Sequence, residues 1–462
     1  MHQLKDDTIT AIATPIGEGG IGVIRISGPQ AIEIAEQIFS GRILITNQES
    51  HTAQYGNIHT PATPSEIIDD VLLLVLKNPK SYTGEDTVEI NCHGGRLVLQ
   101  KIIDVCLMAG ARMAEPGEFT RRAFLNGRLD LIQAENVIDI IQAKSDQSLK
   151  IARSHLDGKL SARIKELRDE MTDIVCHMEA HLDFPDDDID PETQNQIQTR
   201  IQKIIKSLQN LIEHSDTGKV IHHGLTVALT GKPNVGKSSL LNMLIDEDRV
   251  IVSDTPGTTR DTVEVNMEVA GYHVKLIDTA GFRESKDELE NKSLQRAAKI
   301  IDEAHVVLFI MDASMELDAV EAERFKSLAH KSLVLVANKE DCMQTANSQV
   351  FEGLAGETPF LFTSAKTGQG IVALREAIIV DMQKGQAERS DEILVHSVRQ
   401  LNLLRQANQY LELALKAFDT KLSLEFPSSD IRLAIDALGE MVGAIVTDDI
   451  LDKIFSRFCI GK

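Results

Sequence analysis

Four short motifs of the chain carry residue types that bind phosphate or a purine base. The first, residues 231–238 (GKPNVGKS), is a GxxxxGK[ST] loop, and the others are DTAG at 278–281, NKED at 338–341 and SAK at 364–366. In such a loop backbone amides surround phosphate groups, the lysine neutralises their charge, and the terminal hydroxyl binds Mg²⁺. The set predicts a site for a nucleoside triphosphate.

Apolar segments place these motifs at the ends of strands. Residues 225–229 precede the loop and a helical pattern over 239–245 follows it, while segments 274–277, 333–337 and 359–362 precede the other motifs. The helix after the loop would direct its N-terminal amides at phosphate. We therefore expect an α/β domain with its ligand at the carboxyl ends of parallel strands.

The third and fourth motifs predict which base is bound. The carboxylate of Asp341 can accept two hydrogen bonds from the N1 and N2 groups of guanine, whereas adenine offers no such pair of donors. Asn338 and Lys339 would frame the ring, and the Ala365 amide would meet guanine O6. A site that leaves a polar group unpaired discriminates strongly, by about 10⁴ in favourable cases, so the sequence favours GTP over ATP.

The residue after the second motif affects how a water molecule is oriented. Many small GTPases have glutamine there, but this chain has Phe282, which cannot hydrogen-bond to water. An acidic stretch at 284–290 follows closely, and a carboxylate from it could orient the attacking water directly or through a second water. The alternative, which covers most of these acids individually, is a solvated segment.

Asn234, inside the phosphate loop, suggests how transition-state charge is neutralised. Its carbonyl, together with backbone carbonyls of residues 253–259, could hold a monovalent cation where other enzymes use an arginine. Alternatively, the asparagine simply stabilises a turn. Thr258 and Thr259 offer a hydroxyl for Mg²⁺, so we expect this segment to order with GTP and to relax after hydrolysis.

The composition agrees with a large protein that is neither secreted nor embedded in a membrane. The 462 residues, 42% of them hydrophobic, suggest about three domains. No secretory leader and no apolar run of roughly 18 residues is recognisable, so we expect a cytoplasmic protein with no membrane contact. The five cysteines lack CxxC spacing, and the net charge of −22 argues against broad nucleic-acid binding.

Periodic apolar residues on both sides of the nucleotide motifs indicate further domains. Helical stripes run through residues 160–182, 197–211 and 431–458, and segments 8–13, 22–26, 71–76 and 87–91 favour strands, with a helix over 97–108. We predict a multidomain α/β and α+β protein. Its expected parts are an N-terminal α+β domain (1–126), a discontinuous helical domain (127–216 and 381–462) and an inserted P-loop GTPase domain (217–380).

Two local features carry weaker signals. The acidic segment 183–191 interrupts the first helical stripes, and a solvated turn is favoured there over a metal site. The glycine pairs Gly19-Gly20 and Gly94-Gly95 are expected in turns.

Several segments together resemble one protein family over the whole chain. They are ATP at 13–15, GVIRISG at 22–28, YTGED at 82–86, HGG at 93–95, PGEFT at 116–120, RAFLNG at 122–127, the four nucleotide motifs and the terminal CIGK at 459–462. In this order they are similar to the MnmE (TrmE) family of tRNA modification GTPases. The resemblance is more specific than the GTPase motifs alone because it runs from end to end.

The resemblance implies a role in the modification of tRNA. Members of this family work with the FAD-containing protein MnmG to modify C5 of the wobble uridine in certain tRNAs, adding an aminomethyl or carboxymethylaminomethyl group with a folate-derived carbon. They are homodimers that bind folate in the N-terminal domain and form heterotetramers or larger complexes with MnmG. Potassium activates their GTPase as two G domains meet. For this chain the implied substrate is GTP, and the implied cofactors are Mg²⁺, K⁺ and formyl-tetrahydrofolate.

The motifs and the resemblance together assign residues to these ligands. Catalysis is expected from Glu290, Lys237 and Asn234, and formyl-tetrahydrofolate binding from Arg25, Glu89, Arg128 and Lys462, where the family often has lysine in place of Arg128. Mg²⁺ is expected at Ser238 and Thr259, and K⁺ at Asn234, Ser253, Thr255 and Thr258. The expected GTP-binding residues are Asn234, Val235, Gly236, Lys237, Ser238, Ser239, Ser253, Asp254, Thr255, Pro256, Gly257, Thr258, Thr259, Asp278, Thr279, Ala280, Gly281, Asn338, Lys339, Asp341, Ser364, Ala365 and Lys366.

Two functions remain open from the sequence. A GTP-hydrolysing enzyme of tRNA wobble modification accounts for the N-terminal domain and the terminal CIGK, whereas a non-modifying GTP switch in ribosome assembly accounts only for the nucleotide motifs. Cys459 also has two interpretations. It is either a reactive or binding group beside the folate, or an inert cysteine at the end of an apolar helix.

Overall fold

Two compact units make up the chain. The computed structural model describes residues 7–61, 63–183, 194–246, 264–279, 288–343, 348–383, 393–420 and 423–462. Unit 1 comprises Met1–Ile141, Ala152–Leu208 and Asn402–Lys462, and unit 2 comprises Gln142–Ile151 and Gln209–Leu401. The chain therefore passes from unit 1 to unit 2 and back twice, first for the short segment Gln142–Ile151 and then for Gln209–Leu401. Within the described ranges, no helix has the length and apolar character needed to cross a membrane.

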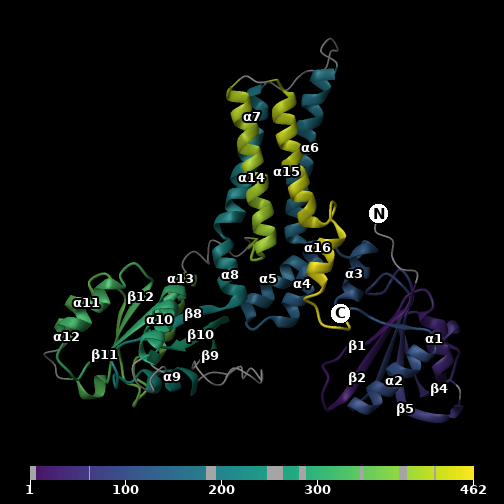
Figure 1. Ribbon diagram of the computed structural model, residues 1–462, viewed down its shortest axis with the longest axis horizontal. Helices are drawn as coiled ribbons and strands as arrows, with labels where there is room; N and C mark the ends of the chain where they lie inside the picture. The colour runs from purple at the N-terminus through teal and green to yellow at the C-terminus, as the bar shows by residue number, and fades with distance from the viewer. Residues whose placement is uncertain are drawn as a thin grey trace. The chain divides into compact units, whose positions relative to one another are not determined.

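A seven-stranded sheet forms the first part of unit 1 (Figure 1). Its order is β3-β4-β5-β6-β2-β1-β7, and all neighbours are antiparallel except the parallel pair β1 and β7. The predicted strands and the helix over 97–108 are confirmed. The elements are β1 (Ile9–Ile12), β2 (Gly19–Ser27), α1 (Ala31–Ile38), β3 (Phe39–Gly41), η1 (Ile45–Asn47), β4 (Thr52–Thr60), β5 (Thr63–Leu76), β6 (Thr87–Gly94), α2 (Arg96–Met108) and β7 (Arg112–Met113).

Glycines in this sheet correct one prediction. Gly19 and Gly20 belong to β2, and Gly94 ends β6, where it pairs with Gly19 instead of lying in a turn. A Cβ atom added at Gly94 would come within 2.5 Å of the Gly19 carbonyl oxygen. Glycine is needed at position 94 because the two strand backbones approach too closely there for a side chain.

Helices form the remainder of unit 1. The predicted stripe over 160–178 is buried on α6, and α6 packs against α15, which carries the stripe that begins at Ile431. The stripe predicted over 431–458 is wrong at Ile445, which is 51% exposed because Gly443 adopts φ 86° and ends α15 at Val442. The helices that lie wholly or partly in unit 1 are α3 (Glu118–Leu125), α4 (Leu131–Gln142), α5 (Asp146–Leu156), α6 (Lys159–Asp183), α7 (Gln194–Glu213), α14 (Val398–Asp419), α15 (Glu425–Val442) and α16 (Asp448–Phe455).

A six-stranded sheet with the order β13-β12-β11-β8-β10-β9 forms the centre of unit 2. Five strands are parallel, and β9 joins the edge antiparallel to β10. The α/β architecture predicted from the nucleotide motifs is confirmed. The elements are α8 (Ser215–His223), β8 (Leu225–Thr230), α9 (Lys237–Asp246), β9 (Glu264–Val269), β10 (Tyr272–Asp278), α10 (Glu288–Glu303), β11 (Val306–Asp312), α11 (Ala319–Ser327), β12 (Leu333–Asn338), η2 (Glu340–Cys342), α12 (Ser348–Ala355), β13 (Phe360–Thr363) and α13 (Ile371–Gln383).

The core of unit 2 explains why these strands read as unbroken apolar runs. Along β11, Leu308 and Ile310 belong to the apolar cluster on one face of the sheet, and Val307 and Phe309 belong to the cluster on the other. Parallel strands are covered on both faces, so the apolar residues of β11, Val306 to Met311, are all buried. The chain runs from β8 to β10 on one side and to β11 on the other, and ligands bind where the strand order reverses in this way.

Candidate functional site

The phosphate loop lies at the carboxyl end of β8, between that strand and α9. An added Cβ at Gly231 would lie 2.1 Å from the Ile310 carbonyl oxygen, and one at Gly236 would lie 2.3 Å from Asn338 Nδ2. Both glycines have positive φ, 144° and 93°. Only glycine permits this tight path, which brings the loop backbone to the N-terminus of α9.

Lys237 and Ser238 are the first two residues of α9. The Lys237 ammonium group donates to the carbonyl oxygens of Gly231 at 2.9 Å and Lys232 at 2.6 Å, so it lies over the loop. The Ser238 hydroxyl lies 3.1 Å from Asp278 Oδ2, at the end of the neighbouring strand β10. A hydroxyl next to a carboxylate supplies the hard oxygen ligands that Mg²⁺ prefers.

The guanine motifs are joined to the phosphate loop by buried hydrogen bonds. Asn338 is 1% exposed; its amide nitrogen donates to the Val235 carbonyl at 2.9 Å, and its oxygen accepts from the Ala365 amide at 3.1 Å. One side chain thus fixes three of the predicted segments. Asn338 cannot be exchanged for a residue with only donors or only acceptors without breaking this link.

Asp341 has the charge and the surroundings expected of a guanine acceptor. The Ser364 hydroxyl donates to its Oδ1 at 2.7 Å, and Lys366 Nζ lies 4.0 Å from its Oδ2. The hydrogen bond from Ser364 lowers the pKa of Asp341, so the group is ionised at neutral pH. An ionised carboxylate accepts hydrogen bonds only, which suits the donor edge of guanine.

Lys339 connects the guanine motif to Asn234 of the phosphate loop. Its ammonium group donates to the Asn234 carbonyl at 2.7 Å and to Asp312 Oδ2 at 2.5 Å. Asp312 was not among the predicted site residues. It could have been found, because it ends β11 just as Asp278 ends β10 and Asn338 ends β12, and polar residues at the carboxyl ends of parallel strands face the ligand.

Some predicted residues lie outside the described ranges. Glu290 falls within the backbone of α10, but its side chain is not described. The acidic segment 183–191, for which a solvated turn was predicted, is described only at Asp183, where α6 ends. The predicted site residues outside the described ranges are Ser253, Asp254, Thr255, Pro256, Gly257, Thr258, Thr259, Ala280 and Gly281.

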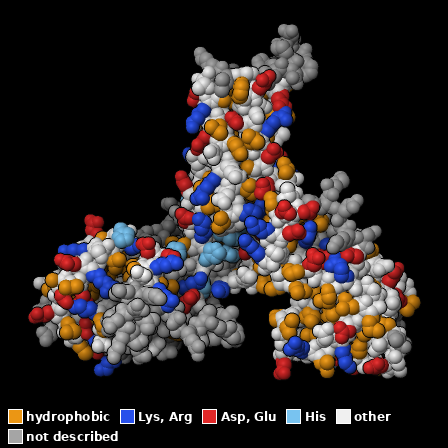
Figure 2. Space-filling model, in the orientation of Figure 1, with side chains coloured by type: hydrophobic (Ala, Val, Ile, Leu, Met, Phe, Trp, Pro, Cys, Tyr) orange, Lys and Arg blue, Asp and Glu red, His pale blue; other side chains and the backbone are white. Residues whose placement is uncertain are grey.

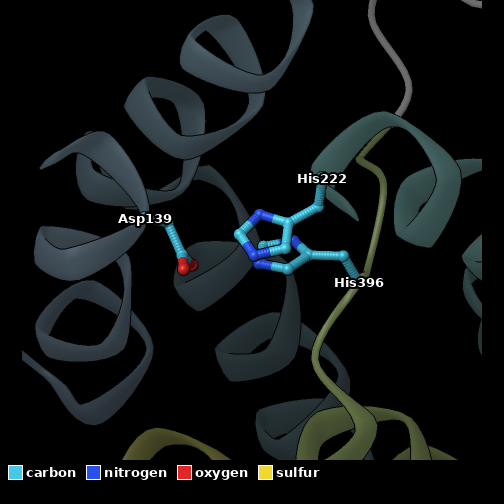
Figure 3. Close-up of side chains that lie close together, drawn as sticks. All are labelled: Asp139, His222 and His396. Carbon is cyan, nitrogen blue, oxygen red and sulfur yellow. The ribbon is translucent and has the colours of Figure 1, made fainter. Parts of the chain in front are cut away.

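The points where the chain enters and leaves the nucleotide-binding fold are also joined. The rings of His222, at the end of α8, and His396, just before α14, stack with centroids 4.3 Å apart (Figure 3). Nearby, a Cβ added at Gly218 would lie 2.7 Å from the Val395 carbonyl oxygen. Close packing therefore fixes the two connections to each other within unit 2.

A second group of predicted residues meets in unit 1. Arg25 on β2 and Glu89 on β6 are paired in register, and Arg25 Nε donates to Glu89 Oε1 at 2.9 Å. The Arg25 guanidinium lies 5.6 Å from the ring centroids of both Tyr82 and Phe119. These rings hold its plane by cation–π contact, which leaves a fixed cationic group at the end of the strand pair.

The C-terminal tail completes this group. Gly461 has φ 96°, and a Cβ added there would lie 2.2 Å from the Ile12 carbonyl oxygen, so the tail is seated directly on β1. The Gly461 carbonyl accepts from Arg25 at 3.5 Å. Burial and the neighbouring Arg25 charge lower the pKa of Lys462. Two adjacent cations attract an anionic ligand.

Arg128 was predicted at the folate site and Cys459 was a candidate for it, and each is held by a different contact. Arg128 Nε donates to the Ser81 carbonyl at 3.1 Å, so the structure ties it to the loop before Tyr82 and not to the pair of Arg25 and Glu89. Cys459 is exposed and without a disulfide. Its carbonyl accepts from the Gly117 amide at 3.4 Å, which anchors the tail to the turn before α3.

Comparison with known proteins finds relatives that align along the whole chain. Residues 8–128 match the family model described as the GTP-binding protein TrmE N-terminus, and residues 131–459 match the MnmE helical domain. The chain is 42% identical over 458 residues to the tRNA modification GTPase MnmE of Acetivibrio thermocellus, covering 99% of this chain and 100% of the relative. It is 41% identical over 456 residues to the protein of that name from Lactobacillus gasseri, covering 99% and 98%.

Solved structures resemble a smaller share of the chain. The Era protein of Aquifex aeolicus, in a variant form bound to GDP.AlF4-, is 27% identical with a TM-score of 0.29, covering 41% of this chain and 67% of that one. The family assignment rests instead on matches to two family models and on relatives that align from end to end. The chain belongs to the MnmE (TrmE) family of tRNA modification GTPases.

Proposed function

We propose that the protein is a potassium-activated GTP hydrolase that acts with MnmG on C5 of the wobble uridine of certain tRNAs. The observation that carries the nucleotide part is the convergence of the Lys237 ammonium, the Ser238 and Asp278 oxygens and the Asn338 network on one loop. The tRNA part rests on family membership over the full chain. A cytoplasmic location is part of the same proposal.

In this proposal the site residues bind GTP, neutralise its charge and orient the attacking water. Lys237 and the α9 amides hold the β and γ phosphates, and Asp341 selects guanine. Ser238 and Thr259 would bind Mg²⁺, which supplies charge neutralisation at the phosphate oxygens. Glu290 would orient the attacking water, because Phe282 cannot.

Potassium activation is supported by the exposed position of Asn234. Its φ of 65° and the hydrogen bond from Lys339 to its carbonyl set the loop backbone at this residue. The Asn234 side chain is exposed and carries an amide oxygen, a hard ligand suited to an alkali cation. We assign the remaining potassium ligands to Ser253, Thr255 and Thr258. A cation at this place would supply the positive charge that an arginine provides in other GTPases.

The second site fits a folate with a glutamate tail. Arg25 and Lys462 match carboxylate groups, Glu89 suits the donor nitrogens of a pterin, and the partly buried ring of Tyr82 provides an apolar wall. We assign formyl-tetrahydrofolate to this site and keep Arg128 at its edge. This ligand would supply the one-carbon unit for the tRNA modification.

The N-terminal domain also offers a surface for a second copy of the chain. Exposed apolar residues lie next to each other in the sheet, including Tyr55 on β4 and its cross-strand partner Leu72 on β5, which are 64% and 52% exposed. Figure 2 shows hydrophobic side chains gathered over this domain. Such patches favour association. We therefore propose a homodimer, with MnmG and tRNA as its partners, and we retain the domain bounds 1–126, 127–216, 217–380 and 381–462.

The decisive experiment is reconstitution. The full chain is incubated with MnmG, GTP, Mg²⁺, K⁺, a formyl-tetrahydrofolate and unmodified tRNA, and the nucleosides are identified by mass spectrometry. We expect C5-modified wobble uridine that requires GTP hydrolysis. Cells without the protein provide the complementary result: intact wobble modification together with accumulated ribosomal precursors would contradict the proposal and support the ribosome-assembly switch.

A further inference from the structure

Three carboxylates between β11 and α11 contact lysines of the nucleotide motifs. Asp312 ends β11, while Asp318 and Glu321 lie at the start of α11. Their lysine partners are Lys339 of the guanine motif and Lys232 of the phosphate loop. The nucleotide motifs include neither Asp312, Asp318 nor Glu321, so this connection has a role that those motifs do not assign.

Asp312 makes the more enclosed of these contacts. Its side chain is 10% exposed and accepts from Lys339 Nζ at 2.5 Å and from the Ser314 hydroxyl at 2.6 Å. Burial acts to raise the pKa of Asp312, but the hydrogen bonds from Lys339 and Ser314 outweigh it and lower that pKa. The carboxylate is therefore charged at neutral pH and directs the Lys339 ammonium.

Lys339 passes this restraint to the phosphate loop. It donates to the Asn234 carbonyl at 2.7 Å. Lys339 and Asn234 have φ values of 67° and 65°, and they are two of the four described residues other than glycine with positive φ. Backbones of this kind cost of order 1–3 kcal/mol and persist only where neighbouring contacts hold them. Asp312 supports this backbone indirectly, because it holds the Lys339 ammonium that donates to the Asn234 carbonyl.

Lys232, at the start of the loop, is held by the other two carboxylates. Its Nζ lies 2.5 Å from Asp318 Oδ2 and 3.1 Å from Glu321 Oε2, and Asp318 is fixed in turn as the N-cap of α11 by the Val320 amide. The Lys232 and Asp318 side chains are about two-fifths exposed, at 41% and 43%. Exposed pairs contribute little, so the pair with Asp318 adds less than the pairs of Glu321 and Asp312, whose side chains are 13% and 10% exposed. Of these, the pair with Asp312 is the one whose lysine also donates to the Asn234 carbonyl.

We infer that Asp312 is a positioning residue for GTP hydrolysis. Through Lys339 it holds the backbone carbonyl of Asn234, and this keeps the phosphate loop in the geometry in which the Asn234 side chain receives the activating cation. The pairing of Lys232 with Asp318 and Glu321 steadies the opposite end of the same loop. This inference rests on the proposed function, because it assigns Asn234 to the potassium site. It adds a link between the guanine motif and that site.

The test compares Asp312→Asn with Asp302→Asn in the full chain. The control removes the same charge in the same unit from an 80% exposed group that pairs with Lys331 at 3.4 Å. GTP turnover is measured against K⁺ concentration at constant ionic strength, and GDP dissociation is measured separately. We expect the K⁺ concentration for half-maximal turnover to rise about tenfold in Asp312→Asn only, because the ion pair with Lys339 becomes a weaker hydrogen bond to a neutral amide oxygen.

The outcomes separate this inference from the function on which it rests. Equal K⁺ requirements in the two variants would overturn the role of Asp312. If the unaltered protein turned over GTP equally in Na⁺ and K⁺, the cation part of the proposed function would fail, and GDP dissociation would decide: about tenfold faster release from Asp312→Asn supports the restraint, and an unchanged rate refutes it. Asp312→Glu, which keeps the charge, should restore part of the effect, and melting curves confirm that each variant is folded.

Discussion

The nucleotide site and the site around Arg25 are assembled over very different distances in the sequence. Lys237 contacts carbonyls five and six positions before it, within one strand-loop-helix segment. Arg25 meets Gly461 across 436 positions. A phosphate loop carries most of its geometry locally, whereas the second site exists only when the C-terminal tail is seated on the sheet. A substitution that impairs ligand binding at one of these sites should therefore leave the other site unaltered.

The largest expected effect is on base selection in the nucleotide site. Asp341→Asn replaces a pure acceptor with a group that presents a donor to guanine, so GTP binding should weaken relative to xanthosine triphosphate by about 10⁴ in the favourable limit. Competition binding with the two nucleotides measures the change, with Glu340→Gln as the neighbouring control. Folate binding should be unaltered, and an unchanged preference for GTP would contradict the assigned contact.

A smaller effect is expected on the chemical step. Glu290→Ala should lower the GTP turnover rate by roughly 10²–10³ with nearly unchanged GTP affinity, because only the orientation of water is lost. Single-turnover kinetics separate the two quantities. Glu303→Ala, at the exposed end of the same helix, is the matched control. Normal turnover in Glu290→Ala would move the water-orienting role to another residue.

Gly461→Ala tests the long-range site. The added methyl group would collide with the Ile12 carbonyl at a φ of 96°, so the tail and Lys462 should leave the sheet. We expect formyl-tetrahydrofolate to bind about tenfold more weakly, with GTP turnover unaffected. Calorimetry reports the binding constant. Gly17→Ala, which meets no atom within 4 Å, is the control, and equal binding by both variants would disprove the docking role.

The smallest expected effect is on the pH dependence of the stability of unit 2. Burial, together with Lys144 and Lys275, lowers the pKa of His273 from 6.5 to about 4. Because the unfolded chain binds this proton first, the stability of unit 2 should fall as pH drops from 6.5 towards 4, by about 1 kcal/mol between pH 7 and pH 5.5. Hydrogen exchange of β10 measures it. In His273→Gln this loss should disappear, and an equal loss in both proteins would be evidence against the assignment.

The elements that were predicted correctly share a local cause. The strands before the nucleotide motifs are buried on both faces and so appear as continuous apolar runs, and the stripe from Leu160 to Met178 has the period of one helix face. The errors occurred where tertiary contacts override local signals. Gly19 and Gly94 lie in paired strands because two backbones meet there, and Ile445 is exposed because Gly443 ends α15 first.

Residue identity at fixed spacing was enough to predict that a strand, a short loop and a helix would carry Lys237 and Ser238, because that geometry is imposed within a few residues. The same reasoning proposed Asp341 as the carboxylate that selects guanine. Only the tertiary structure decided that Asp312 restrains Lys339, that Asn338 ties three motifs together, and that the tail reaches Arg25. These contacts join segments whose proximity depends on the strand order of a sheet or on the packing of the chain's two ends, and no local pattern encodes that arrangement.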